Sequence, residues 1–155
     1  MKPILNLIII ILAFSSCQFA SSQSGEAQTP EKINERFFDL YASKGPGEAL
    51  DYAFSTNAWM DKNQTSDVKV KLNEFTEQLG NYHGKEAISK RSVGENLLLY
   101  TFLIKYDRQA IRYMFIYYKP NNKWQVQKFQ YDVNLETELI EAASAYRLNE
   151  NLPCN

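Results

Sequence analysis

Residues 97–119, LLLYTFLIKYDRQAIRYMFIYYK, decide the fold of this chain. The residues on both sides of the break DRQ at 107–109 are rich in aromatic and branched apolar side chains, which favour strands. A break of this length connects antiparallel neighbours and leaves no room for a crossover helix. The breaks GEN at 94–96 and PNN at 120–122 divide the flanking sequence in the same way. We therefore expect four antiparallel strands, at residues 86–93, 97–106, 111–119 and 124–132.

The two middle strands carry large apolar side chains on both of their faces. Both faces of the middle of the sheet are therefore expected to be covered, with helices on one face and a curled-over pocket or a partner on the other. In the last strand the apolar positions change parity between Val126 and Phe129. That change indicates a β-bulge near Gln127 and Lys128, which would curl the sheet.

Helices are expected before and after the sheet. Residues 29–31, Thr-Pro-Glu, are typical of a helix start, and Gly45 and Gly80 are typical of helix ends. Asn134 is the expected cap of a C-terminal helix. The fold class predicted is α+β, with N-terminal helices packed on a curled four-stranded antiparallel sheet and a C-terminal helix. Three apolar stripes at helical spacing mark the N-terminal helices: Ile33, Phe37, Leu40 and Tyr41; Ala49, Leu50, Ala53 and Phe54; and Val68, Leu72, Phe75 and Leu79.

The first seventeen residues are typical of an export signal. Lys2 gives a positive start, and residues 4–14 are apolar except for Asn6. A helix of that length rises about 16 Å, roughly half of what a bilayer requires, so it is too short for a transmembrane anchor.

The end of this segment, Ser15-Ser16-Cys17, resembles the lipobox of bacterial lipoproteins. The resemblance implies that the thiol of Cys17 is diacylated, that Cys17 becomes the mature N-terminus, and that the chain is anchored to a membrane. The alternative is ordinary secretion, with cleavage at the small residues 20–22. Residues 18–28 are rich in Ser, Gln and Gly and are expected to form a flexible tether, leaving one domain at residues 29–155.

The composition of the chain limits the classes of partner and cofactor that it is expected to bind. The chain has 155 residues, a net charge of −1 and no long basic stretch, so nucleic acid is not expected. The two cysteines, Cys17 and Cys154, form neither a disulfide framework nor a metal-ligand cluster. No cofactor or metal is expected.

Four short segments resemble small exported Bacteroidetes-type proteins of unknown function: GNYHGKE at 80–86, KYDRQ at 105–109, FIYYKP at 115–120 and KW at 123–124. Over about residues 31–146, the order of elements also resembles the nuclear-transport-factor-2-like (NTF2-like) superfamily, whose cystatin-like cone wraps a bent sheet around a long helix. That resemblance implies a cone that often encloses a pocket. It does not choose a function, because the superfamily holds isomerase-like and dehydratase-like enzymes beside non-catalytic binders and assembly modules.

Ring-bearing strand residues and two arginines are the candidate ligand-binding set. A concave sheet lined by rings with a guanidinium could hold an apolar or acidic small molecule. The alternative is that the rings form the core under the helices and the arginines cover the rim. The set comprises Arg91, Tyr100, Arg112, Tyr113, Tyr117 and Trp124, together with His83.

His83 is the only histidine, and as a general base it would need an orienting carboxylate, for which Glu86 is the nearest acid in sequence. The alternative is an exposed loop residue. Asp107 is expected to cap its own turn. Residues 59–60, Trp-Met, are expected to seal a helix junction. HExxH, GxSxG, Walker A and GxGxxG motifs are absent from the sequence.

These observations favour a non-enzymatic, membrane-tethered protein of the bacterial cell envelope that binds a small molecule or another envelope protein. A homodimer formed through the open sheet face is a second hypothesis of the same class. The alternative from another class is a small pocket enzyme of isomerase-like or hydrolase-like type, which needs a buried, perturbed acid or histidine.

Overall fold

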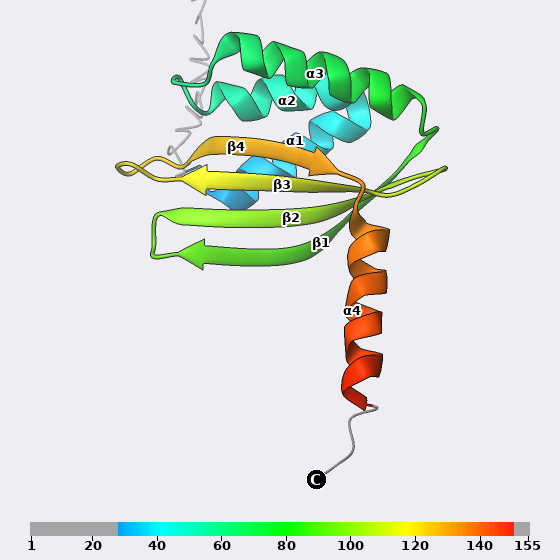
Figure 1. Ribbon diagram of the computed structural model, residues 1–155. Coiled ribbons are helices and arrows are strands. Elements are labelled where there is room, and N and C mark those ends of the chain that lie inside the picture. Colours follow the sequence, from blue (N-terminus) through cyan, green and yellow to red (C-terminus); the bar gives the residue numbers. More distant parts are fainter. Residues whose placement is uncertain (1–27, 151–155) are drawn as a thin grey trace, which may run out of the picture.

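The computed structural model describes residues 28–150, with side chains up to residue 145. The predicted export signal, Cys17, most of the tether and Cys154 lie outside the described residues. Among the residues described, no helix is both long enough and apolar enough to span a membrane. The order of elements confirms the predicted α+β class (Figure 1): α1 (Pro30–Lys44), α2 (Pro46–Ser55), α3 (Lys62–Glu77), β1 (Tyr82–Val93), β2 (Leu97–Tyr106), β3 (Ile111–Tyr118), β4 (Gln125–Asp132) and α4 (Leu135–Glu150).

The N-terminal helices begin where capping side chains satisfy the first free N–H groups of each helix. The Thr29 hydroxyl accepts a hydrogen bond from the backbone N–H of Lys32, and Pro30 occupies the first turn of α1. Asp61 caps α3 by accepting from the backbone N–H groups of Asn63 and Gln64. These caps fix the starts of α1 and α3.

The four strands form one antiparallel sheet in the order β1-β2-β3-β4. The predicted bulge in β4 is confirmed, because Ile116 pairs with Lys128 whereas Tyr117 pairs with Val126, which leaves Gln127 as the extra residue. A second bulge, which the sequence analysis did not predict, leaves Ile88 unpaired in β1.

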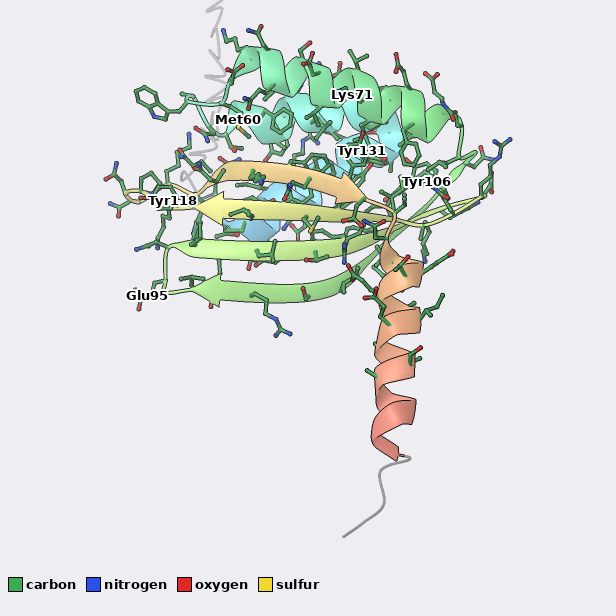
Figure 2. All side chains as sticks on the ribbon, in the orientation of Figure 1. Met60, Lys71, Glu95, Tyr106, Tyr118 and Tyr131 are labelled. Carbon is green, nitrogen blue, oxygen red and sulfur yellow. The ribbon has the colours of Figure 1, made fainter. Side chains whose placement is uncertain are left out.

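One face of the sheet is packed against α1, α2 and α3 (Figure 1). The ring of Phe37 lies 4.9 Å from that of Phe115, and Phe38 lies 4.9 Å from Phe102, so α1 and the sheet meet through edge-on ring pairs. Met60 and Tyr131 pack against this core between the helices and the sheet (Figure 2). The core is therefore largely aromatic.

The other face of the sheet, which we call the open face, has none of these three helices on it. Strand alternation places Leu99, Met114 and Ile116 there, and each is half-buried. Helix α4 leaves the end of β4 and runs away from α1, α2 and α3 (Figure 1). Every α4 residue from 136 to 145 is exposed, including Leu139 at 70% and Ile140 at 66%.

Candidate functional site

The predicted ring residues of the middle strands lie inside the helix-covered core. Tyr113 and Tyr117 have no exposed surface, and Tyr100 is 8% exposed. The Tyr117 hydroxyl donates to Asn34 Oδ1 at 2.6 Å, which ties β3 to α1. A small molecule could reach Tyr113 or Tyr117 only by displacing α1. Tyr113 and Tyr117 therefore cannot contact a ligand or partner at the surface of the molecule.

Three tyrosine hydroxyls meet at one end of this core. Tyr41 shares hydrogen bonds with Tyr106 and, at 2.6 Å, with Tyr113. Burial, reinforced by the neighbouring hydroxyls, raises the pKa of Tyr41 far above its ordinary value. The hydroxyls therefore stay protonated and join α1 to β2 and β3, and they do not supply a base.

His83 lies at the start of β1 and pairs with Asp107, whereas Glu86, its predicted partner, pairs with Lys105. His83 Nε2 is 2.5 Å from Asp107 Oδ1, and the side chains are 54% and 43% exposed. The hydrogen bond from His83, followed by that from the Asn81 backbone, holds the pKa of Asp107 below its usual range. Asp107 thus clamps the β2–β3 turn onto the start of β1. A surface clamp of this kind lacks the enclosure that a general base needs.

Arg112 is engaged by two carboxylates. Its guanidinium donates to Asp132 at 2.9–3.0 Å and to Glu138 at 2.6 and 2.8 Å, and its side chain is 17% exposed. Because Glu138 belongs to α4, this pairing fixes the first turn of α4 to the open face. Arg91 lies exposed on the same face, whereas Trp124 is half-buried beneath the Lys119 ammonium.

The structure therefore divides the predicted ligand-binding residues into separate groups. Three tyrosines lie in the core, two arginines on the open face and one histidine in the surface clamp. The expectation that Trp59 seals a helix junction is wrong, because Trp59 is 90% exposed and Met60 packs on the core instead. The Asn57 side chain accepts a hydrogen bond from the backbone N–H of Trp59. This bond turns the loop so that Met60, the next residue, packs on the core.

The open face and α4 enclose an apolar groove of ≈ 430 Å³. Leu99 and Met114 form its floor, Leu135 and Leu139 of α4 form a wall, and the Arg112–Glu138 pair lies at its edge. A second hollow of ≈ 220 Å³ continues along the same face beside Leu97 and Ile116. Apolar surface thus extends along the open face.

A separate groove, of ≈ 470 Å³, lies between the first turns of α1 and the strands β1 and β2. Here Glu31 accepts hydrogen bonds from Tyr100 and, at 2.7 Å, from Lys90. The bond from Lys90, followed by that from Tyr100, lowers the pKa of the Glu31 carboxyl to about 2. We call this hollow the α1–β1 groove.

Asn34 on this groove is a residue that the sequence analysis missed. It is 5% exposed, and its Nδ2 is a buried donor without a partner in the described part of the chain. The spacing of Asn34, Phe38 and Tyr41 at i, i+4 and i+7 was the available signal, because it places the amide on the apolar face of α1. Between residues 28 and 150, no cluster of three or more His, Cys, Asp or Glu side chains is placed to hold a metal ion.

Comparison with known proteins does not assign a family. No family model and no curated protein matches the sequence. Among solved structures, the chain is similar to a protein from Thiobacillus denitrificans described as a calcium/calmodulin-dependent protein kinase type II association domain. The identity is 12% and the TM-score 0.46, over 68% of this chain and 94% of that one. A likeness at this level identifies neither a fold family nor a function.

Proposed function

We propose that this chain is a non-catalytic, NTF2-like assembly module of the bacterial cell envelope, tethered through Cys17, whose open face binds a second copy of the chain. The observation that carries the proposal is an apolar open face lying beside a helix, α4, that has almost no packing of its own. The order of helices, curled sheet and bulge supports the NTF2-like assignment.

Helix α4 needs a packing partner. It has 16 residues, and isolated helices of this length are marginal in water because most helix stability comes from burying an apolar face. Leu139 and Ile140 are exposed, while the open face nearby exposes part of Leu99, Met114 and Ile116. In a two-fold dimer each α4 can lie on the open face of the other copy, so that both apolar surfaces are buried at once.

Charge favours the same arrangement. Arg91 and Lys128 flank the row of the open face that contains Leu99 and Ile116, and neither has an ion-pair partner in the described residues. On α4, Glu136 and Glu141 are exposed acids without an ion-pair partner in the described residues. Opposite charges on the two surfaces would orient α4 of one copy on the sheet of the other.

The area of the open face indicates that α4 forms part of the proposed dimer interface. The four strands have 12, 10, 8 and 8 residues, and with spacings of about 4.8 Å they cover roughly 600 Å². A stable interface needs about 800 Å² per partner, so the sheet alone is too small. One side of α4, about 24 Å long and 10 Å wide, adds roughly 240 Å² and brings the total close to that requirement.

The test is the oligomeric state of the full chain, measured by analytical ultracentrifugation over a concentration series. We expect a dimer at micromolar concentration. The variants I116E and L139E should shift it to monomer, and the pair R91E/K128E should weaken it at low salt. The matched control is V70E, which changes an apolar residue on α3 that is 52% exposed and far from the open face, and which should remain dimeric.

A wild-type monomer at 100 μM, or loss of the dimer in V70E to the same extent as in I116E, would contradict the proposal. The enzymatic alternative stays a prediction. No observation favours it, because the His83–Asp107 pair lies on the surface.

A further inference from the structure

The α1–β1 groove lies between α1 and the sheet, and it shares only Ile88 and Ser89 of β1 with the groove on the open face. At ≈ 470 Å³ it has the size of a small-molecule site. The bulge at Ile88 forms part of its wall, and bulges often occur where a strand has to make room beside a binding site.

The buried amide of Asn34 is the first indication. Its Oδ1 accepts from the Tyr117 hydroxyl, which fixes the orientation of the side chain. Asn34 lines the groove, and its buried Nδ2 has no acceptor in the described residues. A buried donor left unpaired costs about 1–3 kcal/mol. The side chain therefore holds an unsatisfied N–H donor just beneath the wall of the groove, and an acceptor that enters deeply enough to reach it removes this cost.

The ammonium of Lys85 is the second indication. Its Nζ lies 4.9 Å from the ring of Phe38 and 5.4 Å from that of Phe102, and it has no carboxylate partner in the described residues. Glu31 does not compete for it, because Lys90 and Tyr100 already engage that carboxylate. Lys85 is thus a cation held on an aromatic surface, and it lines the same groove as Asn34.

These groups point to a ligand with an acceptor at one end and an apolar body. Glu35 also lines the groove, but its side chain is exposed, so water screens its charge. We propose that the α1–β1 groove binds the carboxylate of a small apolar acid. The carboxylate accepts from Asn34 Nδ2 and Lys85 Nζ, and the apolar body lies against Phe102 and Ala87.

The test is a titration of the isotopically labelled full chain with 3-phenylpropionate, followed through the Asn34 side-chain amide signal. The matched probe is 3-phenylpropanol, which keeps the apolar body and lacks the carboxylate. We expect a saturable shift with the acid and a response at least about tenfold weaker with the alcohol.

Two variants separate binding from folding. N34D keeps an acceptor for Tyr117 but replaces the donor with an oxygen, and K85Q keeps the aliphatic stem over the rings but removes the charge. Each should weaken binding of the acid by about tenfold, measured on backbone amide signals around the groove, with an unchanged melting temperature for K85Q. E35Q, the control on the same groove, should keep or strengthen binding.

The absence of a saturable shift up to 10 mM acid would overturn this proposal, as would equal binding by K85Q and wild type, or an ordered water as the sole partner of Asn34 Nδ2 in a crystal soaked with the acid. None of these results bears on the dimer, because the varied residues Asn34, Lys85 and Glu35 do not line the hollows of the open face.

Discussion

Asp107 shows how single side chains shape the end of the molecule next to the β2–β3 turn. Its Oδ2 accepts from the backbone N–H and the side-chain amide of Asn81, and its Oδ1 pairs with His83. Gly80, immediately before Asn81, has φ +87, and a Cβ there would lie 2.5 Å from Asp107 Oδ2. Glycine at position 80 therefore allows both the left-handed backbone and the approach of the carboxylate.

We expect G80A to destabilise the domain by more than backbone strain alone. The matched control is G94A, because Gly94 has φ +62 and a Cβ there would meet no atom within 4 Å. Strain alone should make G94A cost about 1 kcal/mol, and the added clash should make G80A cost at least about 2 kcal/mol. Urea denaturation of both variants measures the difference, and equal losses would contradict the importance of the Gly80–Asp107 approach.

At the scale of single residues, sequence spacing predicted the buried apolar residues better than it predicted the contacts between polar side chains. Ile33, Phe37 and Leu72 were expected on apolar faces, and each is fully buried. The pairing of His83 with Asp107 could not be read from spacing, because the two residues are 24 positions apart. Ion pairs of this kind depend on the exact register of the strands, which turn geometry sets together with the apolar pattern, so spacing within one strand does not show them.

At the scale of elements, the bounds of β2 were predicted to the residue, whereas β1 begins at Tyr82, four residues before its predicted start. The early part of β1 contains His83 and Gly84 and a register shift before Lys85, so it lacks the alternation that marks a strand. The bulge in β4 was predictable, because Val126 and Phe129 are both buried and lie an odd number of residues apart. The alternation of apolar and polar residues along a strand reveals a bulge only where large apolar residues lie on both sides of the bulge.

Deleting Gln127 should be far more damaging than changing its side chain. Val126, just before the bulge, is fully buried, its N–H donates to the Thr56 hydroxyl at 2.9 Å, and its carbonyl accepts from Asn57 Nδ2 at 2.9 Å. Removing one residue would turn Val126 toward the open face and break both bonds.

We expect the deletion to cost about 3 kcal/mol of unfolding free energy, the sum of one buried valine and two hydrogen bonds. Q127A, which shortens an exposed side chain and keeps the bulge, should change stability by less than about 0.5 kcal/mol. Chemical denaturation compares the two, and a deletion variant as stable as Q127A would show that the bulge does not set the register of Val126.

At the scale of the whole molecule, the sequence indicated that the second sheet face needs a cover but could not say which. Leu99, Met114 and Ile116 pointed to a covered face, and the structure leaves them half-buried beside an exposed α4. The reason is physical: the strand pattern reports that a face is apolar, and it carries no information on whether the cover comes from the same chain. The proposed second copy supplies that cover.

A lipid on Cys17 would hold both copies of such a dimer at one membrane surface, which favours their association by raising the local concentration. We expect the chain produced in a bacterium to incorporate an alkyne-labelled fatty acid and to sediment with membranes. C17S should lose both properties, because the thiol is the proposed site of acylation. C154S is the matched control and should retain both. Soluble wild-type protein, with an N-terminus at residues 20–22 by mass spectrometry, would instead establish ordinary secretion and would leave dimer formation dependent on the open face alone.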